Sequence, residues 1–154
     1  MNSIVTRNSS WDEKQIEGYF HSAHTPIRIA VSSEDGYPII CSMWFEYSDG
    51  YLWCAAHQSS RLIQALQANA KCSFEISGNE VPYCGVRGRG TVTLDAQSAK
   101  PVLESLIKRY LGNSNSSLSN WLLGRAAEEY AIRIELTRLS AWDFSHRMSP
   151  VSTT

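Results

Sequence analysis

Apolar and polar residues alternate with a period of two along several stretches of the chain, which is the pattern of half-buried β-strands. The alternation is clearest over residues 27–31 and 130–137. The pairs Asp35-Gly36 and Asp49-Gly50 each follow or separate strand-like stretches. Because Asp-Gly tolerates positive φ, it is typical of tight hairpin turns. The first half of the chain is therefore predicted to form an antiparallel meander.

Six strands are expected in all. They span residues 27–31, 38–47, 51–56, 71–77, 83–95 and 130–137, followed by an extended piece at 139–144. The fifth strand contains Gly85, Gly88 and Gly90. Glycine weakens a strand, so three of them indicate sharp coiling at a barrel corner or close approach of a ligand. Hairpins combined with such a strand favour a small antiparallel barrel, closed or split, over an open sheet with exposed edges.

Apolar residues at helical spacing predict three or four helices beside the strands. They lie near residues 10–22, 60–69, 98–111 and 121–127. Ser10 and Glu13 fit a capping box at the start of the first helix. Ser59 or Ser60 is expected to cap the second helix.

Composition and charge exclude several classes of protein. The 154 residues suit one domain, and 43% hydrophobic residues exclude wholesale disorder. The net charge of −1 counts against a nucleic-acid or acidic-membrane binder. We expect a helical segment packing on the barrel, one barrel domain and a flexible tail, at residues 1–24, 25–148 and 149–154 respectively.

Cysteine and histidine spacing gives no sign of a metal site. The four cysteines form no CxxC pair, and the four histidines form no HxH or HExxH motif. Residues 1–11 lack the apolar core of a signal peptide, and no apolar stretch reaches the roughly 18 residues of a membrane span. The expectation is a cytoplasmic protein with reduced thiols and no membrane contact.

Two stretches could bind a flat, phosphorylated ligand. Residues 59–61, Ser-Ser-Arg, join a strand to a helix, where unpaired N–H groups and a guanidinium suit a phosphate. The alternative is an ordinary serine cap followed by a solvated arginine. Residues 41–45 are apolar on both faces, which is typical of a central strand buried on both sides or of a strand that lies against an aromatic ligand.

Two further stretches each allow a ligand-binding and a structural interpretation. Arg87 and Arg89 share one face of the glycine-bearing strand, where they could contact an anion or pair with acids such as Glu75 or Glu135. Residues 142–144, Trp-Asp-Phe, could cover a ligand or a partner subunit, or pack plainly at an edge.

Taken in order, these motifs resemble the FMN-binding split-barrel family of pyridoxamine 5'-phosphate oxidase-like proteins. The segments that carry the resemblance lie within about residues 25–148: Arg28–Val31, Asp35–Pro38, Ser42–Phe45, Asp49–Trp53, Ser60–Arg61 with Leu66 and Asn69, Val86–Gly90, Ile132–Ile134 and Trp142–Asp143. The resemblance implies a mainly β fold with flanking α-helices, built on a six-stranded antiparallel split β-barrel. It also implies a homodimer with FMN at the subunit interface.

The family's pattern implies where this chain would hold FMN. The phosphate maps to Ser59, Ser60 and Arg61, the isoalloxazine ring to Cys41, Ser42, Met43 and Trp44, and the pocket floor to Ala55 and Ala56. Gly85 stands where longer oxidases carry a polar side chain that contacts the ring, and Trp142 would approach from the partner subunit.

The chain departs from the family at three positions. Leu62 follows Arg61 where the family often has lysine, Gly85 lacks a polar side chain, and the C-terminal Arg-Leu-His-Asp-Arg substrate motif is absent. The missing motif argues against oxidation of vitamin B6. We expect an FMN-dependent oxidoreductase of a small substrate. The alternatives are a non-enzymatic flavin or haem carrier or sensor, and an oligonucleotide-binding barrel, which the net charge disfavours.

Overall fold

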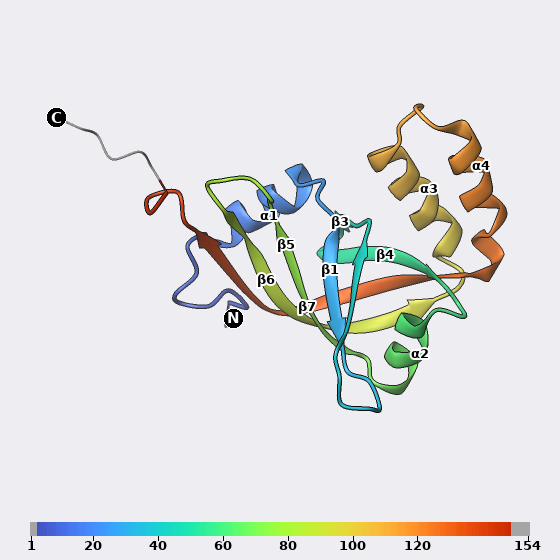
Figure 1. The fold of residues 1–154 in the computed structure, drawn as a ribbon, viewed down its shortest axis with the longest axis horizontal. Coiled ribbons are helices and arrows are strands. Elements are labelled where there is room, and N and C mark those ends of the chain that lie inside the picture. The colour runs from blue at the N-terminus through green and yellow to red at the C-terminus, as the bar shows by residue number, and fades with distance from the viewer. Residues whose placement is uncertain (1–2, 149–154) are drawn as a thin grey trace.

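The computed structural model describes residues 3–148, which form one curled antiparallel sheet with helices around it (Figure 1). The strands are β1 (Ile27–Val31), β2 (Ile39–Met43), β3 (Glu46–Ser48), β4 (Tyr51–His57), β5 (Lys71–Ser77), β6 (Cys84–Asp95) and β7 (Glu129–Asp143). The helices are α1 (Glu13–Ser22), α2 (Arg61–Ala68), α3 (Ala99–Tyr110), α4 (Ser116–Gly124) and the 3₁₀ turn η1 (Ala126–Glu128). The spatial strand order is β2-β1-β5-β6-β7-β4-β3.

The expected mainly β fold with flanking helices is confirmed, but the count of six strands is wrong, because the sheet has seven. The expected single strand 38–47 breaks at Trp44 and Phe45 into β2 and β3. These two strands lie at opposite ends of the strand order, although only two residues separate them. Since three residue steps span at most about 11 Å, the sheet must curl until its two edges approach each other.

At the C-terminal end, the expectation of two separate extended pieces is wrong. The pieces expected at 130–137 and 139–144 form one long strand, β7, which pairs with β6 along the whole length of β6. The register shifts between Arg89 and Gly90, where Thr137 is the extra residue of a β-bulge. A bulge increases the local twist of a strand pair. The two long strands therefore bend together and give the sheet its curl.

The glycines of β6 allow this bend. A Cβ added at Gly90 would lie 2.4 Å from Ile134 Cγ2 and 2.7 Å from the carbonyl oxygen of Glu135. At Gly88 it would lie 2.3 Å from the ring of Phe74. The atoms that approach these glycines belong to the core and to the neighbouring strand. Of the two expectations for this strand, sharp coiling is therefore the one that the structure realises at these positions.

Helix α1 packs on the sheet, with Ile16 and Phe20 fully buried in the same core as the strands. The expected N-cap at Ser10 is wrong, because the cap is Asp12, whose carboxylate accepts from the N–H of Gln15 at 2.8 Å. Ser10 is occupied elsewhere, since its N–H donates to the carbonyl of Ala141 on β7 at 2.9 Å.

Helices α3 and α4 lie next to each other as a hairpin (Figure 1). Helix α3 packs against Ala55 of β4 and Ala131 of β7, on the opposite face of the sheet from the core that holds α1. Helix α4 starts at Ser116, five residues earlier than the helix expected at 121–127, because the side chain of Asn115 caps it by accepting from the N–H of Leu118. None of the helices in residues 3–148 is long and apolar enough to cross a membrane.

The bend at Gly90 gives a test of the fold. Gly90→Ala should lower the free energy of unfolding by about 1–3 kcal/mol, the usual cost of overpacking, because the new methyl group meets the Glu135 backbone. Gly18→Ala is the matched control, since a Cβ at Gly18 in α1 has no atom within 4 Å. That change should instead stabilise the protein by about 0.5–1 kcal/mol. Urea unfolding measures both, and equal effects would contradict the role of Gly90.

Candidate functional site

The turn from β4 into α2 presents a positively charged helix start. The hydroxyl of Ser60 caps the helix by accepting from the N–H of Ile63 at 3.2 Å, as expected for one of the two serines. The first turn of a helix leaves N–H groups without intrahelical acceptors, at the positive end of the helix dipole. The exposed side chain of Arg61 makes no hydrogen bond or ion pair with any residue of the described range 3–148.

A cavity of about 550 Å³ lies between α2 and the loop that joins β1 to β2. Its lining includes Arg61 and Gln64 from α2, Ser33 and Asp35 from the loop, and Ile39 from β2. Its volume falls within the roughly 300–1,000 Å³ of small-molecule sites. Polar side chains from both α2 and the loop line the cavity together with the apolar Ile39, Ala65 and Ala68. This mixture suits a ligand with a charged end and an apolar body.

Asp35 sets the electrostatics of this cavity. The hydroxyl of Ser33 and the N–H of Tyr37 donate to its carboxylate and hold its pKa below the ordinary value, and the charge of Arg61 lowers that pKa slightly further. Asp35 therefore stays ionised at neutral pH. It offsets part of the charge of Arg61 from across the cavity without forming an ion pair with it.

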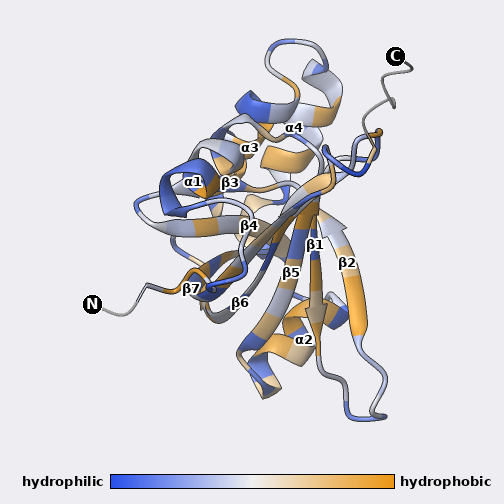
Figure 2. Cartoon of the chain, turned by 90° about the vertical axis from the view of Figure 1, so that its left-hand side faces the viewer, coloured by the Kyte–Doolittle hydropathy of each residue, from blue (hydrophilic) through white to orange (hydrophobic). Residues whose placement is uncertain are grey.

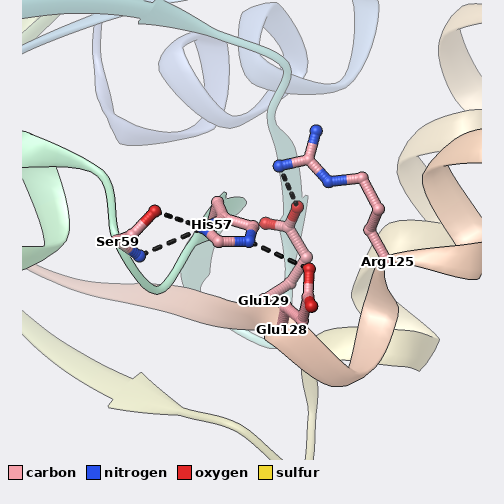
Figure 3. A network of polar contacts seen from close by, with 5 residues as sticks. All are labelled: His57, Ser59, Arg125, Glu128 and Glu129. Carbon is pink, nitrogen blue, oxygen red and sulfur yellow. Dashed lines mark hydrogen bonds and ion pairs between the residues drawn. The ribbon is translucent and has the colours of Figure 1, made fainter.

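A relay of hydrogen bonds lies beside the start of α2 (Figure 3). Nδ1 of His57 accepts from the N–H of Ser59 at 3.1 Å, and the Ser59 hydroxyl lies 2.7 Å from the same nitrogen. Because Nδ1 accepts, the ring carries a proton on Nε2, which donates to Oε2 of Glu128 at 3.1 Å. The ring thus fixes the turn and holds the Ser59 hydroxyl toward β4.

Behind this relay lies a buried acid. The side chain of Glu129 is 8% exposed, and its nearest cation is Arg125 at 3.9 Å. Desolvation by burial raises the pKa of Glu129, while the charges of Arg125 and His57 oppose the shift. Sequence reasoning missed this cluster because His57 and Glu129 are brought together by the pairing of β4 with β7. No local spacing signals that pairing.

Of residues 41–43, which the resemblance assigns to the flavin ring, alternate side chains point to opposite faces of β2. Along β2, Cys41 and Met43 pack against the core, and the exposed Ser42 points to the other face. The thiol of Cys41 is near enough to Arg61 for the arginine to lower its pKa, although burial has the larger effect and raises it overall. β2 is an edge strand, so the expectation of a central strand buried on both sides is wrong.

Trp44 and Ala55 lie together beneath α3. The ring of Trp44 stacks on Tyr110 of α3, with ring centroids 5.1 Å apart and planes within 5°. Both Trp44 and Ala55 pack with Leu103 and Ile107 of the same helix. Ala56 packs against the main core. One face of the Trp44 ring is therefore covered within the chain.

Gly85 and Trp142 form a cross-strand pair at the far end of β6 and β7. The guanidinium of Arg87 lies 4.3 Å from the centre of the Trp142 ring. A Cβ at Gly85 would lie 2.7 Å from the carbonyl oxygen of Ile76, so the absent side chain allows β5 to approach. On β7, Trp142 is eleven residues from Ala131, the partner of Ala55, which is roughly 36 Å along the strand. The structure does not bring this pair to α2.

Among the described residues, no three His, Cys, Asp or Glu side chains lie close enough together to hold a metal ion. No protein-family model matches the sequence, and no curated protein matches it.

Several solved structures share the fold. The conserved hypothetical protein Rv2991 from Mycobacterium tuberculosis matches with a TM-score of 0.79 and 20% identity, over 97% of this chain and 95% of its own. An F420 reductase matches with a TM-score of 0.67 and 19% identity, over 79% and 93%. A pyridoxamine 5'-phosphate oxidase-like protein from Listeria innocua matches at 0.60 and 13%, over 86% and 94%. The haem storage protein HutZ from Vibrio cholerae matches at 0.65 and 13%, over 85% and 93%.

At these identities the likeness establishes the fold. The chain has the same fold as flavin-binding and pyridoxamine 5'-phosphate oxidase-like split-barrel proteins, so the resemblance indicated by the sequence is confirmed at the level of the fold.

Proposed function

We propose that this protein binds FMN and acts as a flavin-dependent oxidoreductase of a small substrate. The observation that carries the proposal is the cavity beside α2, which combines a helix start, an arginine without a partner in the described chain and apolar lining residues such as Ile39 and Ala65. The fold adds support, because an F420 reductase and a pyridoxamine 5'-phosphate oxidase-like protein share it.

The residues of the cavity fit the two ends of FMN. Arg61, the N–H groups of the first helical turn and the hydroxyl of Ser60 suit the phosphate, while the hydroxyl of Ser59 is engaged with Nδ1 of His57. The ring would lie along β2, where Ile39 and Cys41 offer apolar contacts on the face that looks toward α2. A single arginine stands at the phosphate end, since Leu62 replaces the second cation.

A bound flavin supplies hydride and electron transfer, and the chain supplies binding and orientation. The Ser59–His57–Glu128 relay would fix the turn that presents Ser60 and Arg61 to the phosphate. Asp35 would limit the positive charge of the cavity, which favours a ligand with one phosphate over one with several.

The proposal includes a homodimer that completes the flavin site. Trp142 is far along β7 from the α2 cavity, so it can contribute to that site only from a second copy of the chain. The edge of the sheet at β2 is apolar and open (Figure 2). Ile40 is 70% exposed, and the neighbouring Tyr37 is 78% exposed. An apolar edge strand of this kind favours pairing with another chain.

Removing the arginine tests the cofactor site. Arg61→Ala should weaken FMN binding by about 1.5–3 kcal/mol, the range for a charged hydrogen bond. Fluorescence titration of the purified apoprotein with FMN measures the affinity. Arg28→Ala is the matched control, because Arg28 on β1 donates to Asn79 and does not line the cavity. Equal affinities of both variants and the unmodified protein would place the phosphate elsewhere.

The visible spectrum of the purified protein separates the two classes of cofactor. A flavin should give its paired near-ultraviolet and blue bands, and turnover of reduced nicotinamide should follow. A Soret band in place of the flavin bands would overturn the proposal in favour of haem binding, as in the matched haem storage protein.

Sedimentation tests the dimer. At micromolar concentration we expect a mass of twice the chain's 17.3 kDa. Ile40→Lys should shift the mass toward the monomer and weaken FMN binding, because it places a charge on the exposed apolar edge. Trp121→Lys, at an apolar residue on α4 that is 56% exposed, serves as the control and should leave the dimer intact. A monomer in the unmodified protein would remove Trp142 from the site.

A further inference from the structure

The outward face of β5, β6 and β7 carries two arginines directly opposite each other. The strand register pairs Arg89 of β6 with Arg138 of β7, and both side chains are exposed. Side chains directly opposite on antiparallel strands have Cβ atoms about 4.5–5.5 Å apart, and like charges there are destabilising. Neither guanidinium has an ion pair or hydrogen bond with another residue of the described range 3–148.

Arg87, unlike Arg89, is paired with an acid. Arg87 stands two residues from Arg89 on the same face, and its Nε lies 3.2 Å from Oε2 of Glu75. It also covers the ring of Trp142. Of the two open interpretations of this strand, pairing with an acid is therefore realised for Arg87. It is not realised for Arg89, whose cross-strand neighbours are Ser73 and Arg138.

The backbone holds the arginine pair in this arrangement. The β-bulge lies directly beside it, and the hydroxyl of Thr137 donates to the carbonyl of Arg89 at 3.1 Å. Without the extra residue of the bulge, the cross-strand neighbour of Arg89 would be a different side chain. The juxtaposition of like charges thus comes from the same feature that bends the sheet, and it is fixed by main-chain pairing on both sides.

The pair borders a hollow of about 320 Å³, whose lining also includes Ser73 and Ser140. Neither hydroxyl makes a hydrogen bond with another described residue. A second hollow of about 520 Å³ shares Ser73 and Arg89 and adds Lys71. The 320 Å³ hollow is therefore lined by the unpaired guanidinium groups of Arg89 and Arg138 and by two hydroxyls, beside Arg87, which is paired with Glu75.

We propose that Arg89 and Arg138, with Ser73 and Ser140, form a binding site for the phosphate group of a small phosphorylated molecule. A phosphate monoester carries a charge near −2 at neutral pH, which matches the two arginines. Its terminal oxygens accept several hydrogen bonds, which suits two guanidinium forks and two hydroxyls. A carboxylate carries one charge and two oxygens, so it compensates only one of the two arginines.

This site is distinct from the one proposed for FMN and does not depend on it. The FMN cavity is lined by α2, the β1–β2 loop and the face of β2 that looks toward α2, and shares no lining residue with the 320 Å³ hollow. The ligand offsets the repulsion between the arginines, so phosphate should stabilise the protein beyond the effect of ionic strength.

Methyl phosphate and acetate are the probes, titrated at equal ionic strength and followed through the Nε–Hε resonances of arginine. Methyl phosphate should give saturable shifts of the Arg89 and Arg138 signals, and acetate should give smaller ones. Arg89→Gln and Arg138→Gln should each weaken binding by about tenfold or more. Arg28→Gln, an arginine on the neighbouring strand outside both hollows, should leave it unchanged.

A second measurement uses the repulsion itself. In dilute buffer without phosphate, the thermal midpoint of Arg138→Gln should lie above that of the unmodified protein. Added methyl phosphate should raise the midpoint of the unmodified protein and leave that of the variant unchanged. Non-saturable shifts, equal responses to acetate, or unchanged binding in both variants would overturn the site. FMN titration of Arg138→Gln separates the two proposals, because its FMN affinity should equal that of the unmodified protein while Arg61→Ala loses affinity.

Discussion

The ladder between β6 and β7 is the constraint on which the other elements depend. It lies in the middle of the strand order and joins the half that holds β5, β1 and β2 to the half that holds β4 and β3. Its bulge at Arg89 and Gly90 twists both long strands. Because only Trp44 and Phe45 separate β2 from β3, the two edges of the sheet can be joined only if this ladder curls the sheet toward closure.

The curl also decides what lies inside and outside. Gly88 and Gly90 face the core, where a methyl group would collide with Phe74 or Ile134. The residue between them, Arg89, faces outward beside Arg138. Glycines that face inward thus alternate with an arginine that faces outward along β6, and this alternation has two effects. It lets the strand coil tightly, and it places uncompensated charge on the convex face.

The fold was largely predictable from the sequence, because alternation and Asp-Gly turns act locally. Strands such as β1 and β5 appear within the expected bounds. The errors fall where a distant contact decides. At the break after Met43, the ring of Trp44 stacks on Tyr110 and the N–H of Phe45 donates to the Tyr110 hydroxyl. Before the helix that Asp12 caps, the N–H of Ser10 donates to Ala141 on β7.

The candidate site was predictable only where it is contiguous in sequence. Ser60 and Arg61 lie at the start of α2 as expected, because a serine cap and the helix that follows it are encoded side by side. The Glu128 partner of His57 and the Arg138 partner of Arg89 come from strand register, which no motif within one segment reveals. The resemblance assigns Gly85 and Trp142 to the same site as α2. Within one chain, however, this pair lies at the far end of β6 and β7, away from α2.

The position of unpaired cations is more informative about ligands here than the total charge. With 14 basic and 15 acidic residues, the chain could in principle pair nearly every cation with an acid. Arg87 and Arg125 are paired in this way with Glu75 and Glu129. Arg61, Arg89 and Arg138 are among the many described cations that have no acidic partner, and each of these three borders a cavity. Like charges that the fold holds together keep a cost in the free protein, and an oxyanion bound between them removes it. A nearly neutral chain can therefore bind anions strongly at a few fixed points, without the basic surface that would attract nucleic acid.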